Sequence, residues 1–294
     1  MTAIDNGRVC QSPNGESSSY MTCKAADSTT SLSPTESENS DVDSLFDEPS
    51  TPAHPVAIRT APPIPGLFIP PVFLTQELED EIAGQCMRLY FEDRDVNQIM
   101  LFGRTVSSTE GDEDDIDERM GKGLPPFLIS LLHHLSEILK PWIPGTVHAL
   151  LFPPRDAPPR ARQAILNLYR PGEGITAHVD LLNRFDDGII GVSFQSGCVM
   201  TFDRGAPDDG RKPRDASDPD ARNRWDLYLP ERSILVLSAD ARYLWTHGIP
   251  ARMHDLVQDN HGDACLIERG TRLSITFRWL LPGADIVGGP DAAS

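Results

Sequence analysis

The stretch Arg272-Leu-Ser-Ile-Thr-Phe-Arg278 alternates strictly between polar and apolar residues. Successive side chains of a β-strand point to opposite faces, so this period of two predicts a strand with one polar and one apolar face. An arginine on a buried polar face carries a desolvation cost unless an anion meets it, and guanidinium groups bind carboxylates well. The alternative is an edge strand with a solvated polar face. The two faces are Arg272, Ser274, Thr276 and Arg278, and Leu273, Ile275, Phe277 and Trp279.

Short apolar runs of the same kind recur after residue 160, separated by clusters of glycine, proline and aspartate. Two earlier segments have a helical period instead: one is capped by Thr75, and a leucine-rich one is ended by Pro141. Many short strands after a helical layer predict an α+β fold with a sandwich or barrel core. The helical segments place apolar residues at Leu78, Ile82, Cys86 and Leu89, and at Leu128, Leu131, Leu132, Leu135, Ile138 and Leu139; the strand runs are 164–169, 189–194, 198–202, 225–229, 233–238, 241–246 and 272–280.

Residues 1–62 are rich in Ser, Thr, Asp, Glu and Pro and poor in aromatic residues. Such a segment buries too little apolar surface to offset the entropy of ordering, so we expect a disordered, acidic N-terminal segment. One domain is expected over 63–283, followed by a flexible tail over 284–294. Within the domain, 203–224 has six acidic and six basic residues and no apolar pattern, which indicates a surface insertion, and 252–270 is expected to be a second long loop.

The formal net charge of −18 is concentrated in two places. Residues 1–62 contribute −6, and the run Glu110-Gly-Asp-Glu-Asp-Asp-Ile-Asp-Glu118 contributes −7, which leaves −5 for the remainder. The acidic total therefore does not exclude a nucleic-acid partner, although it removes the simple electrostatic argument for one.

The sequence also bears on the compartment. It has no run of about 18 apolar residues and no basic or apolar signal region at its start, so we expect neither a membrane span nor a secretory signal. Scattered cysteines, none in a CxxC pair, argue against a disulfide framework or a structural zinc site and indicate a reducing compartment, the cytoplasm or the nucleus. They are Cys10, Cys23, Cys86, Cys198 and Cys265.

His178-Val-Asp180 places an imidazole and a carboxylate two residues apart, on one side of an extended segment. By itself such a pair occurs by chance in many proteins. His247, at the end of another apolar run, adds a second imidazole. Two histidines and one carboxylate form the facial triad that holds non-haem Fe(II) and leaves coordination positions open. The alternative for His247 alone is an ordinary core or surface position.

Asn167 and Tyr169 alternate on one face of the run that leads to His178. They offer an amide and a phenol, both capable of binding a polar ligand. Taken alone, they are more typical of ordinary polar positions on a half-exposed strand.

Together these residues resemble the AlkB family of Fe(II)- and 2-oxoglutarate-dependent dioxygenases. The matching blocks occur in the family's order: Asn167-Leu-Tyr169-Arg-Pro-Gly-Glu-Gly-Ile-Thr-Ala-His178-Val-Asp180, then His247-Gly, then Arg272-x-Ser-x-Thr-x-Arg278. The resemblance covers residues 64–282. It implies a double-stranded β-helix (jelly roll) braced by N-terminal helices, and an enzyme that couples the oxidation of 2-oxoglutarate by molecular oxygen to the oxidation of a C–H bond.

The resemblance also implies roles for single residues. His178, Asp180 and His247 are the expected ligands of Fe(II), which makes them catalytic residues together with Arg278. The implied cofactors are Fe(II), 2-oxoglutarate as co-substrate, and molecular oxygen. In this chemistry the metal is the reactive centre, and the protein orients the reactants and excludes water.

For 2-oxoglutarate, the resemblance implies two groups of residues. Arg272, with Tyr169 and Ser274, is expected to hold the distal carboxylate. Arg278 and Asn167 are expected near the end that chelates the metal. Guanidinium forks are suited to both carboxylates of this co-substrate.

A narrower similarity is to the AlkB-type domain that elsewhere is fused to a tRNA wobble-uridine methyltransferase. It rests on the segments 185–194, 230–249 and 268–272. We expect this chain to lack the RNA-recognition and methyltransferase domains of that branch. Leu182 stands where DNA-repair members carry an acid used in base recognition, which argues against direct repair of alkylated DNA bases.

Three functions are compatible with these observations. The first is demethylation or hydroxylation of an alkyl group on a nucleic acid, RNA or tRNA before DNA, by a monomeric enzyme. The second is the same chemistry on a protein side chain, because the acidic total offers no obvious phosphate-binding stripe. The third is a non-catalytic binding protein on the same fold. If RNA is the substrate, the candidate cations are Arg88, Arg104, Arg211, Lys212, Arg214, Arg222 and Arg224.

Overall fold

The computed structural model describes residues 55–92, 94–105, 120, 122–154, 156–205, 223–259 and 261–284. The predicted N-terminal segment up to residue 54, the acidic run 110–118, most of the predicted insertion and the predicted tail after residue 284 lie outside these residues. The expected domain boundary at residue 63 is wrong. Ala57 is fully buried and forms a bridge with Val257, and Ile58 forms one with Leu227, so the domain begins no later than residue 57.

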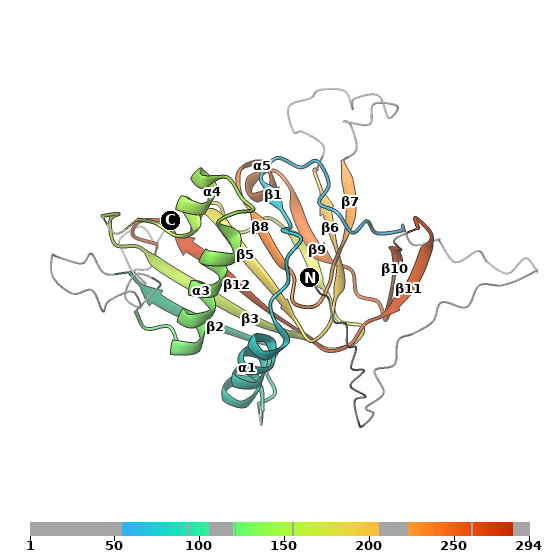
Figure 1. Ribbon diagram of the computed structural model, residues 1–294, viewed down its shortest axis with the longest axis horizontal. Coiled ribbons are helices and arrows are strands. Elements are labelled where there is room, and N and C mark those ends of the chain that lie inside the picture. The colour runs from blue at the N-terminus through green and yellow to red at the C-terminus, as the bar shows by residue number, and fades with distance from the viewer. Residues whose placement is uncertain are drawn as a thin grey trace, which may run out of the picture. The chain divides into compact units, whose positions relative to one another are not determined.

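Six strands form the larger of the two main antiparallel sheets in the described part of the chain (Figure 1). The central strand β12 pairs with β5 on one side and with β3 on the other. The alternation of β12 therefore gives this sheet an apolar face and a polar face, as the sequence predicts. Across the sheet, the strands are β1 (Leu67–Phe68), β8 (Ile234–Leu237), β5 (Phe185–Phe194), β12 (Arg272–Leu280), β3 (Ala161–Tyr169) and β2 (Gln98–Arg104).

Four strands form the smaller sheet, which packs against part of the polar face of the larger one. Their shared core includes Ile189 and Leu235 from the larger sheet and Met200 and Leu227 from the smaller one. Two facing antiparallel sheets with this topology form the predicted double-stranded β-helix. The strands are β4 (Ile175–His178), β9 (Thr246–Ile249), β6 (Cys198–Asp203) and β7 (Arg224–Leu229), in that order; a hairpin of β10 (His254–Gln258) and β11 (Ala264–Glu268) stands beside them.

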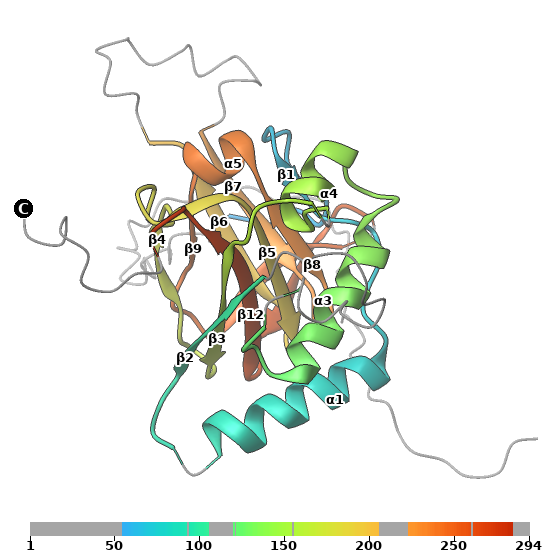
Figure 2. The same ribbon diagram turned by 90° about the vertical axis from the view of Figure 1, so that its left-hand side faces the viewer.

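Helices cover the apolar face of the larger sheet (Figure 2). The helix α1 (Gln76–Cys86) begins at Thr75, whose hydroxyl accepts a hydrogen bond from the Leu78 amide, and it continues into the π-helical turn η1 (Met87–Phe91). The leucines of α3 (Pro126–Leu139) and the end of α4 (Gly145–Leu151) pack on β3, β5 and β12. No helix among the described residues is long and apolar enough to cross a membrane.

Two segments differ from the sequence prediction. A strand is predicted over 241–246, but the short helix α5 (Ala239–Tyr243) precedes β9, because the buried Arg242 side chain turns to bind backbone carbonyls. A loop is predicted over 252–270, but this stretch contains the hairpin β10–β11. Its first strand, β10, lacks an apolar run because one of its two buried residues is the charged Asp255, the other being Val257.

Candidate active site

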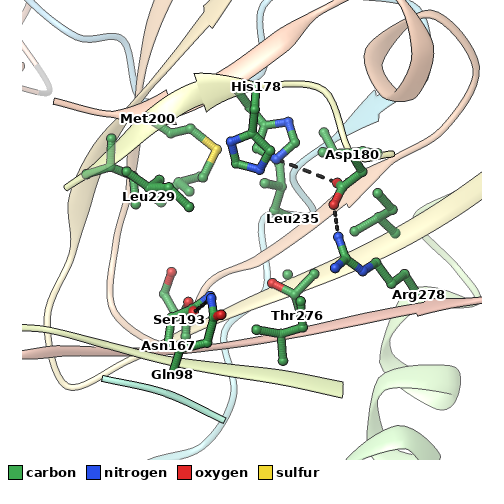
Figure 3. Close-up of a pocket in the computed structure, with 18 of the residues that line it drawn as sticks. Gln98, Asn167, His178, Asp180, Ser193, Met200, Leu229, Leu235, Thr276 and Arg278 are labelled. Carbon is green, nitrogen blue, oxygen red and sulfur yellow. Dashed lines mark hydrogen bonds and ion pairs between the residues drawn. The ribbon is translucent and has the colours of Figure 1, made fainter. Parts of the chain in front are cut away.

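A cavity of about 360 Å³ lies between the two sheets (Figure 3). The polar residues of β12 face into it, with neighbours from β2, β3 and β5. Apolar side chains from both sheets, among them Met200, Leu229 and Leu235, close the remaining wall. All residues that the sequence assigns to the site line this cavity: Asn167, Tyr169, His178, Asp180, His247, Arg272, Ser274 and Arg278.

The registers of β2, β3 and β12 arrange the polar face of the larger sheet in rows. Successive rows on one face of a sheet are two residues, about 7 Å, apart along each strand. Arg272 and Arg278 therefore stand at opposite ends of the cavity, three rows apart. In order, the rows are Tyr169 and Arg272; Gln98, Asn167 and Ser274; Met100, Ile165 and Thr276; and Phe102, Gln163 and Arg278.

His178 and His247 are direct cross-strand partners in β4 and β9, and their ring centroids lie 4.7 Å apart. The Nδ1 of His178 lies 2.8 Å from the carbonyl oxygen of Thr176. Because a carbonyl can only accept, Nδ1 carries the proton and Nε2 keeps its lone pair for a ligand. Gly248 permits this close approach, since an added Cβ would stand 2.7 Å from the backbone of Ala177.

Asp180 is buried, and its two carboxylate oxygens face different partners. Its Oδ2 lies 3.8 Å from the Nε2 of His247, and its Oδ1 contacts the guanidinium of Arg278. Burial, with the nearby His178 and Arg242, lowers the pKa of His247 to about 3. This imidazole is therefore neutral near pH 7, and its contact with Asp180 is not an ion pair.

These three side chains fit a non-haem iron site by their chemistry. Two neutral imidazoles and one carboxylate oxygen are the donor set that holds Fe(II) with open positions. Within the described part of the chain, no three such donors already stand at metal-binding separations. Ligand atoms at about 2.1 Å from one metal stand about 3 Å apart, so the 3.8 Å between His247 and Asp180 must shorten slightly.

Arg278 is held from two sides. Its Nε donates a hydrogen bond of 2.8 Å to the Oε1 of Gln163, and its guanidinium lies over the ring of Phe185, 3.6 Å from the centroid. Burial lowers the pKa of Arg278 to about 10, which leaves it charged near pH 7. Arg278 therefore fixes one oxygen of Asp180 and leaves the other turned toward His247.

Arg272 is a buried cation at the other end of the cavity, 6% exposed. Its guanidinium donates a hydrogen bond of 2.9 Å to the Oγ of Ser193 and lies 5.5 Å from the ring centroid of Tyr169. Its Nε has no partner, and none of the ion pairs among the described residues includes Arg272. A buried guanidinium without a counter-ion is a site for an anion.

Asn167 occupies the row next to Arg272, and its Oδ1 accepts a hydrogen bond of 2.7 Å from Gln98. The resemblance places Asn167 with Arg278 at the chelating end of 2-oxoglutarate. In the structure the two side chains stand two rows apart, so that contact stays a prediction.

Arg242 links the two segments that carry the candidate ligands. It is 2% exposed, and its guanidinium donates hydrogen bonds to the carbonyls of Asp180 (3.1 Å), Phe185 (2.9 Å) and Asp186 (3.3 Å). These bonds tie both ends of the turn after Asp180 to α5, which leads directly into His247. One buried side chain thus sets the position of β9 relative to the Asp180 turn.

Residues 75–278 match the 2OG-Fe(II) oxygenase superfamily. The chain belongs to this superfamily. The oxygenase is therefore an enzyme by family, and Fe(II) and 2-oxoglutarate are the family's cofactor and co-substrate. The site described above lies within the matched region.

The oxygenase is similar to three relatives over part of their lengths. It is 40% identical over 127 residues to the tRNA (carboxymethyluridine(34)-5-O)-methyltransferase ALKBH8 of Macaca fascicularis, covering 40% of this chain and 17% of that protein. It is 30% identical over 226 residues to the alkylated DNA repair protein ALKBH8 homolog of Arabidopsis thaliana, covering 73% and 58%. It is 34% identical over 92 residues to the N6-methyladenosine RNA demethylase ALKBH of Cryphonectria parasitica, covering 31% and 39%. The matches span between 17% and 58% of these relatives' lengths.

Sequence reasoning missed four residues of the oxygenase site. Gln98, Gln163 and Ser193 stand on the inner face in register with predicted residues, so the alternation of their strands could have identified them once pairing was known. Arg242 could not be identified in this way, because its role depends on carbonyls more than 50 residues away in the sequence.

Proposed function

We propose that the oxygenase oxidises an alkyl group on a nucleic acid, RNA or tRNA before DNA, with Fe(II) held by His178, Asp180 and His247. The observation that carries the chemistry is the arrangement of one cavity, with two imidazoles and a carboxylate at one end and a buried cation without a counter-ion at the other. When bound, Fe(II) supplies oxygen activation at the expense of 2-oxoglutarate, which leaves as succinate and carbon dioxide.

The chain's own residues bind and orient the co-substrate. Arg272 meets the distal carboxylate, with Tyr169 and Ser274 in the adjoining positions of the inner face. Burial raises the pKa of Tyr169, so the phenol stays protonated and can donate to a carboxylate oxygen. Arg278 and Asn167 serve the chelating end. Met200, Leu229 and Leu235 exclude water from the apolar wall of the cavity.

Replacing Arg272 by lysine is expected to raise the concentration of 2-oxoglutarate needed for half-maximal turnover. A lysine keeps the charge but gives one point contact in place of a planar fork, so the loss should be about 1–3 kcal/mol. The measurement is succinate release as a function of 2-oxoglutarate concentration, with Arg170→Lys, an exposed arginine, as matched control. Unchanged saturation in Arg272→Lys would assign the distal carboxylate to another residue, such as Arg278.

Replacing Arg242 by lysine is expected to weaken metal binding, because the turn after Asp180 loses hydrogen bonds at both ends. Mutation of a residue that orients metal ligands typically lowers the affinity for the metal by about 10- to 100-fold. Titration of the protein with Mn²⁺, followed by electron paramagnetic resonance, gives the affinity directly. Arg224→Lys, at the exposed first residue of β7, is the control. Equal Mn²⁺ affinity in both variants would contradict this role of Arg242.

The choice of nucleic acid as substrate is supported by the relatives, two of which are named for action on tRNA or RNA. A protein side chain is the second candidate, and the net charge of −18 favours it, because phosphate groups are repelled by an acidic protein. The two are separated by adding total RNA or an RNA-free protein extract to the iron-loaded enzyme. Stimulation of succinate release by RNA supports the proposal, and stimulation by the protein extract alone supports the second candidate.

A further inference from the structure

The strand β4, which ends at the candidate ligand His178, is held weakly by its own sheet. In the described part of the chain it is an edge strand of four residues, none of them buried. It pairs in register with β9 at Ile175 with Ile249 and at His178 with His247, and the pairing is irregular between these positions. The separation of the two imidazoles therefore depends on contacts from outside this strand pair.

The backbones of β4 and β9 lie close together along this pair. A Cβ added at Gly174, just before β4, would stand 2.1 Å from the carbonyl oxygen of Ile249 at the end of β9. A Cβ added at Gly248 would stand 2.7 Å from the backbone of Ala177. Glycine permits such an approach because it has no side chain, but it does not enforce one. Other groups must hold the two strands at this distance.

The buried side chain of Arg269 binds both strands at the end away from the imidazoles. Its Nη1 donates a hydrogen bond of 2.6 Å to the carbonyl of Pro250, directly after β9. The same nitrogen donates one of 3.5 Å to the carbonyl of Glu173, two residues before β4. One guanidinium nitrogen thus bridges the end of one ligand strand and the start of the other.

Asp255 anchors the rest of the Arg269 guanidinium. The Nε and Nη2 of Arg269 donate hydrogen bonds of 2.7 and 2.8 Å to the two carboxylate oxygens, a bidentate geometry to which arginine is suited. Asp255 is fixed in turn by the amide of Val199 in β6, at 3.0 Å, and by Arg252. Because β6 also pairs with β9, the anchor is attached to the strand that carries His247.

We propose that Arg269 is a positioning residue for the metal site, which sets the separation of His178 and His247 from the far end of β4 and β9. Arg242 binds the carbonyls of the turn after Asp180, at the other end. A buried arginine therefore fixes the strand pair on each side of the imidazoles. The inference rests on the proposed Fe(II) ligands, and it adds to them a residue that does not line the cavity.

Titration of the full-length protein with Mn²⁺, followed by electron paramagnetic resonance, tests this inference. Arg269→Lys is expected to weaken Mn²⁺ binding about tenfold, the lower end of the range for residues that orient metal ligands. An ammonium group cannot bind Asp255 in a bidentate manner and also reach both carbonyls. Gly174→Ala is expected to weaken Mn²⁺ binding as well, because the added Cβ pushes β4 away from Ile249.

Glu79→Gln is the control for lost stability. Glu79 is a buried carboxylate of α1 that pairs with Arg232, and neither residue lines the active-site cavity. Breaking this ion pair should lower the unfolding temperature and leave the Mn²⁺ affinity unchanged. All affinities are measured well below the unfolding temperature of each variant.

The outcomes separate the two proposals. If the unaltered protein binds Mn²⁺ and Arg269→Lys binds it equally well, Arg269 has only a structural role while the proposed ligands stand. An equal loss of affinity in Glu79→Gln would also contradict the inference, because lost stability would then account for the effect. If the unaltered protein does not bind Mn²⁺, the proposed ligand set itself fails. If Arg269→Lys does not fold, Gly174→Ala is the decisive variant.

Discussion

Replacement of Asp180 by alanine is expected to abolish 2-oxoglutarate turnover while the protein remains folded. The candidate triad would lose its anionic ligand, and two neutral imidazoles bind a divalent cation weakly. Arg278 loses its counter-ion, so some loss of stability is expected, but it keeps its hydrogen bond to Gln163 and its contact with Phe185, and the fold should persist. Succinate release by the iron-loaded variant is the measurement, and the unfolding temperature without metal checks the fold.

Asp95→Ala, at an exposed aspartate before β2, is the control for Asp180→Ala and should retain full turnover. The metal affinity of both variants is measured by Mn²⁺ titration, so that loss of binding can be told apart from loss of chemistry. Turnover at the unaltered rate in Asp180→Ala would remove this residue from the ligand set.

Replacement of Asp255 by alanine is expected to lower the free energy of unfolding by about 3–5 kcal/mol, the cost of breaking a buried ion pair. Asp255 is 1% exposed and accepts hydrogen bonds from Arg269 (2.7 and 2.8 Å), from Arg252 (2.6 Å) and from the Val199 amide (3.0 Å). Its removal would leave the guanidinium of Arg269, 7% exposed, without a counter-ion. Urea unfolding measures the change, and Glu268→Ala, on the exposed face of β11, should have little effect.

The hydrogen bonds and ion pairs of Asp255 also predict how the free energy of unfolding depends on pH. Burial alone would raise the pKa of Asp255, but the hydrogen bonds and charge of Arg269, with those of Arg252 and Val199, hold it below its ordinary value. A carboxyl with a lowered pKa stabilises the folded state above about pH 4, where an unfolded aspartate is ionised, and this stabilisation is lost as the pH falls through the folded pKa. The unaltered protein should therefore lose more stability than Asp255→Ala on acidification below that pH.

The alternating stretch 272–278 predicted the central strand of the jelly roll, because a strand with one face on a core must alternate. The structure confirms that its apolar residues meet the helices and that its polar residues meet the cavity. The capped helix after Thr75 and the leucine-rich helix before Pro141 follow the same reasoning and are also confirmed. In each case a long, regular pattern reflects burial of one face.

Elements without such a pattern could not be predicted. The edge strand β2 carries apolar residues on both faces, in the continuous run 99–102, and β4 has no buried residue, so neither shows an alternation of polar and apolar residues. The hairpin β10–β11 was not predicted because a buried position of β10 is occupied by the charged Asp255. This burial depends on hydrogen bonds from Arg269, which form only when the chain folds. The cavity lined by Arg104, Lys122 and Arg184 could not be predicted either, since these residues come from three segments of the chain.

The measurement that tests the central claim most directly is mass spectrometry of nucleosides from total tRNA after incubation with the iron-loaded enzyme, 2-oxoglutarate and isotopically labelled oxygen. The account predicts that one modified nucleoside gains labelled oxygen or loses its alkyl group. It predicts no such change with Asp180→Ala. An unchanged set of nucleosides, alongside succinate release driven by a protein extract, would contradict the assignment of RNA as the substrate.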